Sequence, residues 1–194
     1  MITQKIEKYK IHIGNHPKSR KFGKASISGY NAILNVSDYP PYKPSKKSTE
    51  IHWFPIEEWN GWGYSPLYHA VHILDRLIKQ KKKIYIHCWA GKHRSVMITY
   101  LYLRSLGNSE EEVFKLFDSQ FSIEFRGEKR KIKNWLRDIY KRDVKNKRIE
   151  KDSIQFMKIV RENPELSILE VLQILKKKTI ETDFFVVLGD KNGK

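Results

Sequence analysis

One segment, residues 82–107, constrains the fold most strongly. In it a short apolar run is followed by a short loop and then by a helical pattern. The run KKIYIH, residues 82–87, is too short for a helix and favours a buried strand. The run RSVMITYLYLRSLG, residues 94–107, predicts a helix capped by Gly107 at its C-terminus. A strand followed so closely by a helix is typical of an α/β sheet.

The same alternation continues on both sides of this segment. Strands are expected at residues 6–15, 32–36 and 50–56. Helices are expected at residues 66–80, 109–121 and 128–142. Ser65 is expected to cap the first of these helices, with Pro66 at its first position. Ser109 and Glu112 have the spacing of a capping box for the second.

These elements predict an α/β fold with a central mixed or parallel sheet flanked by helices. After about residue 141 the chain becomes mostly charged, in KRDVKNKRIEK. Helical patterns follow at residues 152–163 and 165–178, and a short strand is expected near the end. We expect residues 1–145 to form the main domain. Residues 146–194 are expected to be a helical C-terminal extension that packs on the core or binds a partner.

Cysteine usage and hydropathy limit the class of protein. The chain has 194 residues and one cysteine, which excludes an intramolecular disulfide framework and a multi-cysteine zinc site. A reducing compartment, and so a cytoplasmic location, is expected. No apolar run approaches the roughly 18 residues that span a bilayer, and the N-terminus has no long apolar segment typical of a secretory signal.

The charge is strongly unbalanced, with 38 Lys and Arg against 22 Asp and Glu, a formal +16. Such a surface favours anionic partners: phosphorylated protein, nucleic acid or anionic lipid head groups. Residues 126–151 hold twelve basic and four acidic side chains and would form a cationic face. Solvated lysines that serve no partner are an equally good interpretation. A dedicated nucleic-acid module is not indicated, because no motif of that kind is present.

The loop after the 82–87 strand has the residues that bind and attack a phosphate. A loop at a helix N-terminus can turn several backbone N–H groups toward a tetrahedral oxyanion. Gly91 permits the backbone conformation that this requires, and Arg94 can donate two parallel bonds to phosphate oxygens. Cys88 would there be a thiolate able to attack phosphorus, with Ser95 hydrogen-bonded to its sulfur. The alternative is that Cys88 is a small buried residue at a strand end.

The segment from His87 to Ser95, HCWAGKHRS, matches the H-C-x-x-G-x-x-R-S/T signature of the protein tyrosine phosphatase superfamily. Its surroundings resemble the dual-specificity branch, through IHIGN, AILNVS and FPIEEWN, over roughly residues 9–140. The resemblance implies that residues 1–145 are a phosphatase domain that needs no metal or cofactor. It implies Cys88 as the nucleophile, Arg94 as the phosphate clamp and Ser95 as the leaving-group helper. The substrate-binding residues it implies are Trp89, Ala90, Gly91, Lys92, His93 and Arg94.

The position of the general acid departs from the family pattern. The family places an aspartate on a loop about thirty residues before the cysteine, and here that loop reads FPIEEWN. Glu58 aligns best with the acid and has the same chemistry with one more methylene. Asp38, in NVSDYP, is the next candidate, and Glu57 is the third. Solvated loop glutamates are the alternative interpretation.

The substrate is left open by the sequence, although a phosphorylated protein is favoured. Lys92 adds a cation to the loop, as in the lipid-phosphatase branch, which would suit a phosphoinositide or the 5′ end of an RNA; it can equally point to solvent. Trp53, Trp59, Trp62 and Trp89 are numerous enough to line a pocket, although core packing is the commoner fate of tryptophan. A phosphatase-like protein that binds phosphate without hydrolysing it is the non-enzymatic alternative.

Overall fold

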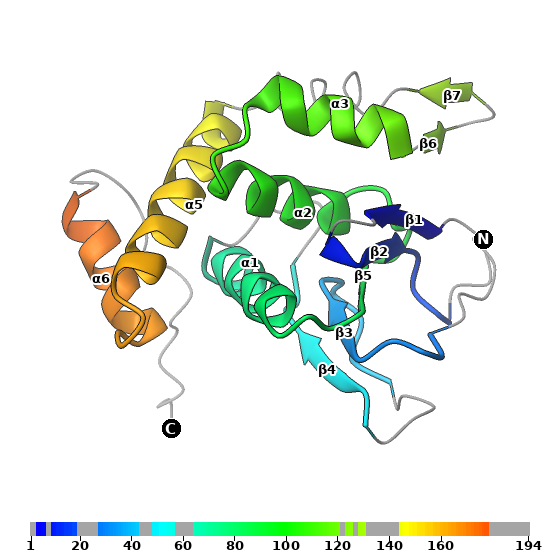
Figure 1. Ribbon diagram of the computed structural model, residues 1–194, viewed down its shortest axis with the longest axis horizontal. Helices are drawn as coiled ribbons and strands as arrows, with labels where there is room; N and C mark the ends of the chain where they lie inside the picture. Colours follow the sequence, from blue (N-terminus) through cyan, green and yellow to red (C-terminus); the bar gives the residue numbers. More distant parts are fainter. Residues whose placement is uncertain are drawn as a thin grey trace, which may run out of the picture.

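The structure, a computed structural model, describes residues 3–6, 9–18, 27–42, 48–56, 64–120, 123–125, 128–130 and 144–178. Within them, one sheet contains five strands in the order β1-β2-β5-β3-β4 (Figure 1). Their bounds are β1 Thr3–Ile6, β2 Ile11–Gly14, β3 Ala32–Asn35, β4 Glu50–Trp53 and β5 Ile84–His87. Two further strands, β6 (Ile123–Phe125) and β7 (Glu128–Arg130), pair with each other in antiparallel fashion.

The main sheet is mixed: β2, β5, β3 and β4 run parallel, and β1 pairs with β2 in the opposite direction. The three central strands end level with one another. His87 at the end of β5 is paired with Gly14 of β2 on one side and with Asn35 of β3 on the other. The loop after β5 therefore leaves the sheet at its carboxyl edge, where α/β proteins bind their ligands.

Side chains of the central strands alternate between two buried faces of the sheet. Ile84 and Ile86 belong to the large core shared with the helices. Tyr85, between them, belongs instead to a smaller cluster with Tyr30 and Tyr42. Every residue of β2, β3 and β5 is buried, which explains why these strands have near-continuous apolar sequences.

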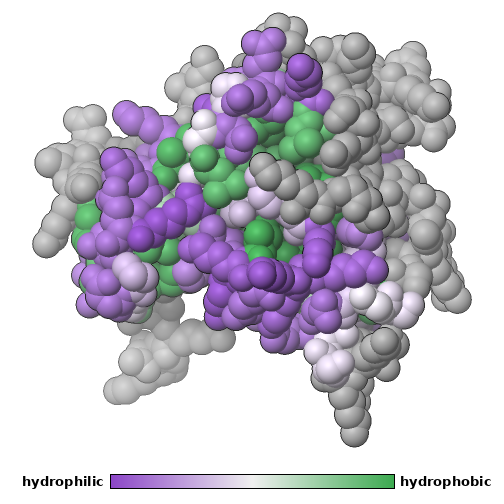
Figure 2. Space-filling model, viewed as in Figure 1, coloured by the Kyte–Doolittle hydropathy of each residue, from purple (hydrophilic) through white to green (hydrophobic). Residues whose placement is uncertain are grey.

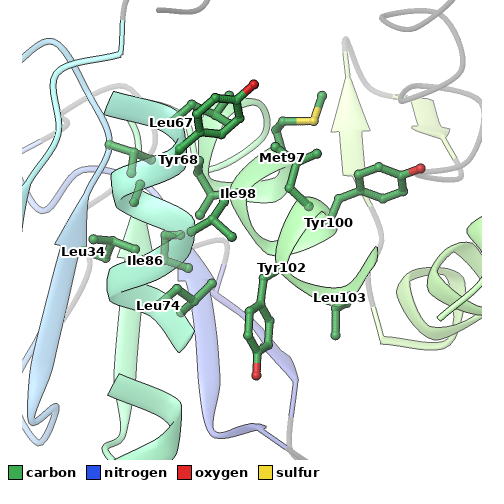
Figure 3. Close-up of a cluster of buried hydrophobic side chains, with 14 of the residues drawn as sticks. Leu34, Leu67, Tyr68, Leu74, Ile86, Met97, Ile98, Tyr100, Tyr102 and Leu103 are labelled. Atoms are coloured by element: carbon green, nitrogen blue, oxygen red, sulfur yellow. The ribbon is translucent and has the colours of Figure 1, made fainter. Parts of the chain in front are cut away.

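Helices α1 (Tyr64–Lys79) and α2 (Arg94–Ser105) pack against each other and against the sheet (Figure 1). Leu67 and Leu74 of α1 and Ile98 of α2 point into a common core (Figure 3). All three side chains are fully buried. Removing each from water contributes roughly 1.5–3 kcal/mol, so this contact anchors α2, whose first residue is Arg94.

Helix α3 (Glu110–Gln120) follows α2 after a turn at Gly107, whose positive φ of 90° suits glycine. The backbone N–H of Ser109 donates to the Glu112 carboxylate at 2.6 Å, and the N–H of Glu112 donates to the Ser109 hydroxyl at 3.1 Å. These two bonds form the expected capping box, which is confirmed.

Helix α5 (Val144–Glu162) crosses beside the ends of α1 and α2, and α6 (Ile168–Lys178) packs on its outer side (Figure 1). Phe156 of α5 is fully buried and stacks on Tyr68 of α1, with ring centroids 5.2 Å apart. Figure 2 shows the surface of the molecule from the same side as Figure 1. Hydrophilic side chains cover much of the described surface there, and hydrophobic side chains are visible between them. Helix α5 thus shares the core of α1 and α2, across the boundary expected at residue 145.

The predicted α/β class and the strands at 32–36 and 50–56 are confirmed, with bounds shorter than expected. The prediction that Ser65 caps a helix is wrong: α1 begins at Tyr64, so Ser65 lies inside its first turn. The prediction of a helix from residue 128 is wrong for Glu128–Arg130, because these residues form β7, which pairs with β6 in antiparallel fashion. Most of that predicted helix, and the strand predicted after residue 180, lie outside the described residues.

The first C-terminal helix begins eight residues earlier than the predicted 152–163, at Val144. The sequence before residue 152 is rich in Lys and Arg, so its few apolar residues did not indicate a helix. Ile149 is nevertheless buried, one helical repeat of seven residues before Phe156. The contact of Ile149 with the core is consistent with a helix that extends toward the N-terminal side of residue 152. Whether residues 146–194 act as a separate extension stays a prediction.

Candidate active site

The loop of residues 88–93 joins the end of β5 to the start of α2, and it passes very close to the end of β2. Gly91 has a φ of +70°, a conformation that other residues rarely adopt. A Cβ on Gly91 would lie 2.4 Å from the carbonyl carbon of Gly14. The N–H of His16 donates to the carbonyl of Trp89 at 3.0 Å, which ties the loop to the same segment. Glycine is therefore required at position 91 for the loop to have this shape.

Cys88 lies at the base of this loop, with a relative exposure of 1%. Its Sγ is 3.5 Å from the hydroxyl oxygen of Ser95, in the first turn of α2. Burial acts to raise the pKa of the thiol, but hydrogen bonds from the backbone and hydroxyl of Ser95 and the charge of Arg94 outweigh it. The pKa of Cys88 is consequently lowered from its ordinary value, which favours the thiolate.

Arg94 is the first residue of α2, and its side chain is 1% exposed. Its Nη1 donates to Asp38 Oδ1 at 2.8 Å and to the carbonyl oxygen of Ile56 at 2.7 Å. These acceptors come from the loops after β3 and β4, so three segments of the carboxyl edge converge on one guanidinium. The N-terminus of α2 adds partial positive charge at the same place, and together they favour an anion there.

His87 is buried under the loop and held in one tautomer. Its Nδ1 lies 3.1 Å from the carbonyl oxygen of Cys88, which can only accept, so Nδ1 carries the proton. Its Nε2 lies 2.9 Å from the hydroxyl of Tyr42 and accepts from it. Burial lowers the pKa of His87 to about 3, so the ring stays neutral near pH 7. His87 therefore holds the loop and has no charge to exchange with a substrate.

Aromatic side chains stand on one side of the loop. The rings of Trp89 and Tyr39 stack with centroids 4.3 Å apart, and the ring of the buried His16 lies 5.3 Å from that of Trp89. Tyr39 is 45% exposed and Trp53 is 39% exposed. The indole N–H of Trp53 donates to the carbonyl of Ser37 at 2.9 Å. The exposed aromatic surface next to the loop is thus anchored to the segment that contains Asp38.

The structure brings together most of the residues that the sequence singled out. Cys88, Arg94, Ser95 and Asp38 meet at the carboxyl edge of the sheet. Trp89, Ala90, Lys92 and His93 are half-buried in the loop itself, and Gly91 is buried. The remaining candidates, Glu57, Glu58, Trp59 and Trp62, lie outside the described residues.

Sequence reasoning missed the residues that hold the loop from below. Tyr42 lies between β3 and β4 in the sequence, is 8% exposed and is bonded to His87 through its hydroxyl. The carbonyl of Asn15 accepts from the hydroxyl of Tyr85 at 2.8 Å, which fixes the segment next to Gly91. Nothing in the sequence indicated that Asn15 and Tyr85, which are 70 positions apart, would be hydrogen-bonded.

The described residues contain no group of His, Cys, Asp and Glu side chains placed to hold a metal ion. None of the helices in the described part of the chain is long and apolar enough to cross a membrane. What the site does contain is a buried thiol with a lowered pKa, next to a buried guanidinium at a helix N-terminus. The fold and the site thus define an α/β protein with a buried cysteine at the base of a loop that leads into a helix.

Comparisons with solved structures find chains that are similar at low sequence identity. No family model and no curated protein matches the chain. Similar solved structures include DUSP15, at 11% identity and a TM-score of 0.49, covering 91% of this chain and 96% of that one. Human DUSP28 has 15% identity and a TM-score of 0.48, covering 61% and 82% of the two chains. The Orf virus tyrosine phosphatase OH1 has 16% identity and a TM-score of 0.43, covering 57% and 72%.

Proposed function

We propose that the protein is a cysteine-dependent phosphatase that hydrolyses phosphomonoesters through a phosphocysteine intermediate. The observation that carries the proposal is the position of the buried Cys88 Sγ, 3.5 Å from the hydroxyl oxygen of Ser95, in the first turn of the helix that begins with the buried Arg94. A buried cysteine that only fills space is an inert thiol, whereas Ser95 and Arg94 beside Cys88 favour its ionised form. The same residues are those that the superfamily signature assigns to catalysis.

In the first step, the Cys88 thiolate attacks the phosphorus atom of the substrate, an S–P bond forms and the P–O bond to the leaving group breaks. Backbone N–H groups of the loop and the Arg94 guanidinium stabilise the equatorial oxygens. In the second step, water attacks the phosphocysteine, the S–P bond breaks and inorganic phosphate leaves. The Ser95 hydroxyl stabilises the sulfur as it regains its negative charge.

We propose Glu58 as the acid that protonates the leaving oxygen. The family pattern supports this, because Glu58 occupies the position of the family's acid in FPIEEWN. Glu58→Gln should slow hydrolysis of esters with poor leaving groups and flatten the acidic-to-neutral pH profile. Loss of that profile in Asp38→Asn instead would assign the acid to Asp38.

The substrate class we propose is a phosphorylated protein, bound through phosphotyrosine, phosphoserine or phosphothreonine. Phosphoinositides and 5′-triphosphorylated RNA are the alternatives that Lys92 keeps open. A panel with one substrate of each class, compared by kcat/KM, separates them. RNA as the substrate would also give an affinity that falls steeply with salt. We infer a cytoplasmic location from the single cysteine of the chain.

The decisive test is Cys88→Ser with a small aryl phosphate as substrate. Hydrolysis should be lost, while binding of a tetrahedral oxyanion should remain, because the loop and Arg94 are unchanged. Full turnover by this variant would end the proposal. Binding without turnover by the wild-type chain would identify the rival, a protein that reads phosphate without hydrolysing it.

A further inference from the structure

Asp38 makes a contact that a general acid does not need. Its Oδ1 accepts from Nη1 of Arg94 at 2.8 Å, although the two residues are 56 positions apart in the sequence. The Asp38 side chain is 50% exposed, whereas that of Arg94 is 1% exposed. The buried cation is thus balanced by a carboxylate that reaches the surface. An isolated buried charge is costly, so this pairing stabilises Arg94 in its place.

The segment around Asp38 is built to hold it still. The Asn35 side chain accepts from the Ser37 N–H at 3.0 Å and from the Ser37 hydroxyl at 2.6 Å. The Asn35 amide group also donates to the carbonyl of Tyr39 at 3.1 Å. Asn35 and Ser37 are fully buried. Both neighbours of Asp38 are therefore fixed by side chains that no substrate reaches, and the carboxylate has a defined position.

The contact also determines which edge of Arg94 can face a phosphate. Nη1 of an arginine carries two hydrogens, and Asp38 and the Ile56 carbonyl accept both. A bidentate grip on two phosphate oxygens then has to use the edge formed by Nε and Nη2. A guanidinium held in advance loses less conformational freedom when the anion binds, which raises affinity.

We propose that Asp38 is the positioning residue of the phosphate clamp: it holds Nη1 of Arg94 so that the opposite edge faces the bound phosphate. This inference rests on the proposed function for the identity of the ligand, but it concerns binding and not proton transfer. It assigns Asp38 a different role from the general acid for which its sequence position made it a candidate.

The test compares Asp38→Ala, which removes the acceptor, with Asp38→Asn, whose amide oxygen can still accept from Nη1. Each is made in the Cys88→Ser chain, and binding of tungstate, a tetrahedral oxyanion, is measured by calorimetry. Asp38→Ala should weaken binding about tenfold or more, and Asp38→Asn should stay within about threefold of the parent. Asp38→Leu, close to Asn in shape but without an acceptor, is the second loss variant if Asp38→Ala folds poorly.

Glu50→Ala is the matched control, since Glu50 is 46% exposed and pairs with Lys82 and His52 away from the loop. It should leave tungstate binding unchanged. In the chain with Cys88 intact, Asp38→Ala should lower kcat/KM equally for good and poor leaving groups. A loss confined to poor leaving groups in Asp38→Asn would make Asp38 the acid and overturn the inference.

The two proposals fail in different ways. Unchanged tungstate binding in both Asp38→Ala and Asp38→Leu would refute the positioning role, whatever the turnover of the wild-type chain. Weakened binding in these variants, together with no turnover by the wild-type chain, would uphold the positioning role and refute hydrolysis.

Discussion

The ion pairs Arg94–Asp38 and Arg161–Asp75 bury opposite partners. In the first, the arginine is 1% exposed and the aspartate 50%. In the second, the aspartate is 5% exposed and the arginine 25%. Asp75 is also paired with Lys79 at 2.8 Å, so the buried anion has two cations around it. The pair at the loop keeps a buried cation at a ligand-binding edge, whereas the pair between α1 and α5 closes a structural contact.

The two ion pairs use the same chemistry for two purposes. At the loop, positive charge is concentrated by the start of α2 and by Arg94, and the half-exposed Asp38 carboxylate pairs with that arginine. Between α1 and α5, Arg161 also donates through Nη2 to the hydroxyl of Ser105 at 3.2 Å, so α2 is joined as well. We therefore expect changes at the first pair to alter function and changes at the second to alter stability.

The largest effect is expected for Arg94→Lys. Lysine keeps the charge but lacks the planar fork, so it cannot grip two oxygens or hold Asp38 and Ile56 together. We expect kcat/KM for an aryl phosphate to fall about 10²–10³-fold, with a melting temperature close to that of the wild type. Steady-state kinetics and thermal unfolding measure the two quantities. Activity within threefold of the wild type would show that the fork is not used.

Asp75→Ala should have the largest effect on stability. It leaves Arg161 without its buried partner, and we expect the free energy of unfolding to fall by about 3 kcal/mol. Urea unfolding measures this, and the folded fraction should keep its kcat/KM. Glu162→Ala is the control, because Glu162 and Lys158 form an exposed pair at 3.8 Å that should contribute about 0.5 kcal/mol or less. Equal losses in the two variants would contradict the distinction between the pairs.

Ser95→Ala tests the electrostatics of the loop. The Ser95 hydroxyl stabilises the thiolate, so its removal should raise the pKa of Cys88. The rate of alkylation by iodoacetate follows the thiolate fraction, and its pH profile should therefore move to higher pH in the variant. We expect a smaller loss of kcat than in Arg94→Lys, about tenfold, because the backbone N–H of Ser95 remains. An unshifted alkylation profile would show that the hydroxyl plays no part.

Tyr100→Phe should have the smallest effect. The Tyr100 hydroxyl donates to Glu150 of α5 at 3.2 Å, and Arg104 donates to the same carboxylate at 2.5 Å. Because Arg104 still satisfies Glu150, the loss should be about 1 kcal/mol of unfolding free energy. Urea unfolding should show it with no change in catalysis. A loss as large as that of Asp75→Ala would mean that this contact, and not Arg161–Asp75, dominates the joint with α5.

The local features of the site were readable because each depends on neighbours in the chain. Gly91 and Arg94 follow Cys88 at fixed short distances, and the strand before them and the helix after them are strongly apolar. The Ser109 and Glu112 capping box is local in the same way. Where long-range packing decided, prediction failed: α5 begins at Val144 because the tertiary core buries Ile149, and Glu128–Arg130 pair with β6.

By itself, the sequence determined the α/β class, the loop and the order of Cys88, Gly91, Arg94 and Ser95 along it. Only the tertiary structure decided which distant residues contact this loop and its flanking residues. Asp38 and Ile56 meet Arg94, and Tyr42 meets His87, because parallel strands end at one edge and bring their loops together. A pattern of residues records spacing along the chain, whereas a hydrogen bond between residues 56 positions apart depends on the register of the sheet.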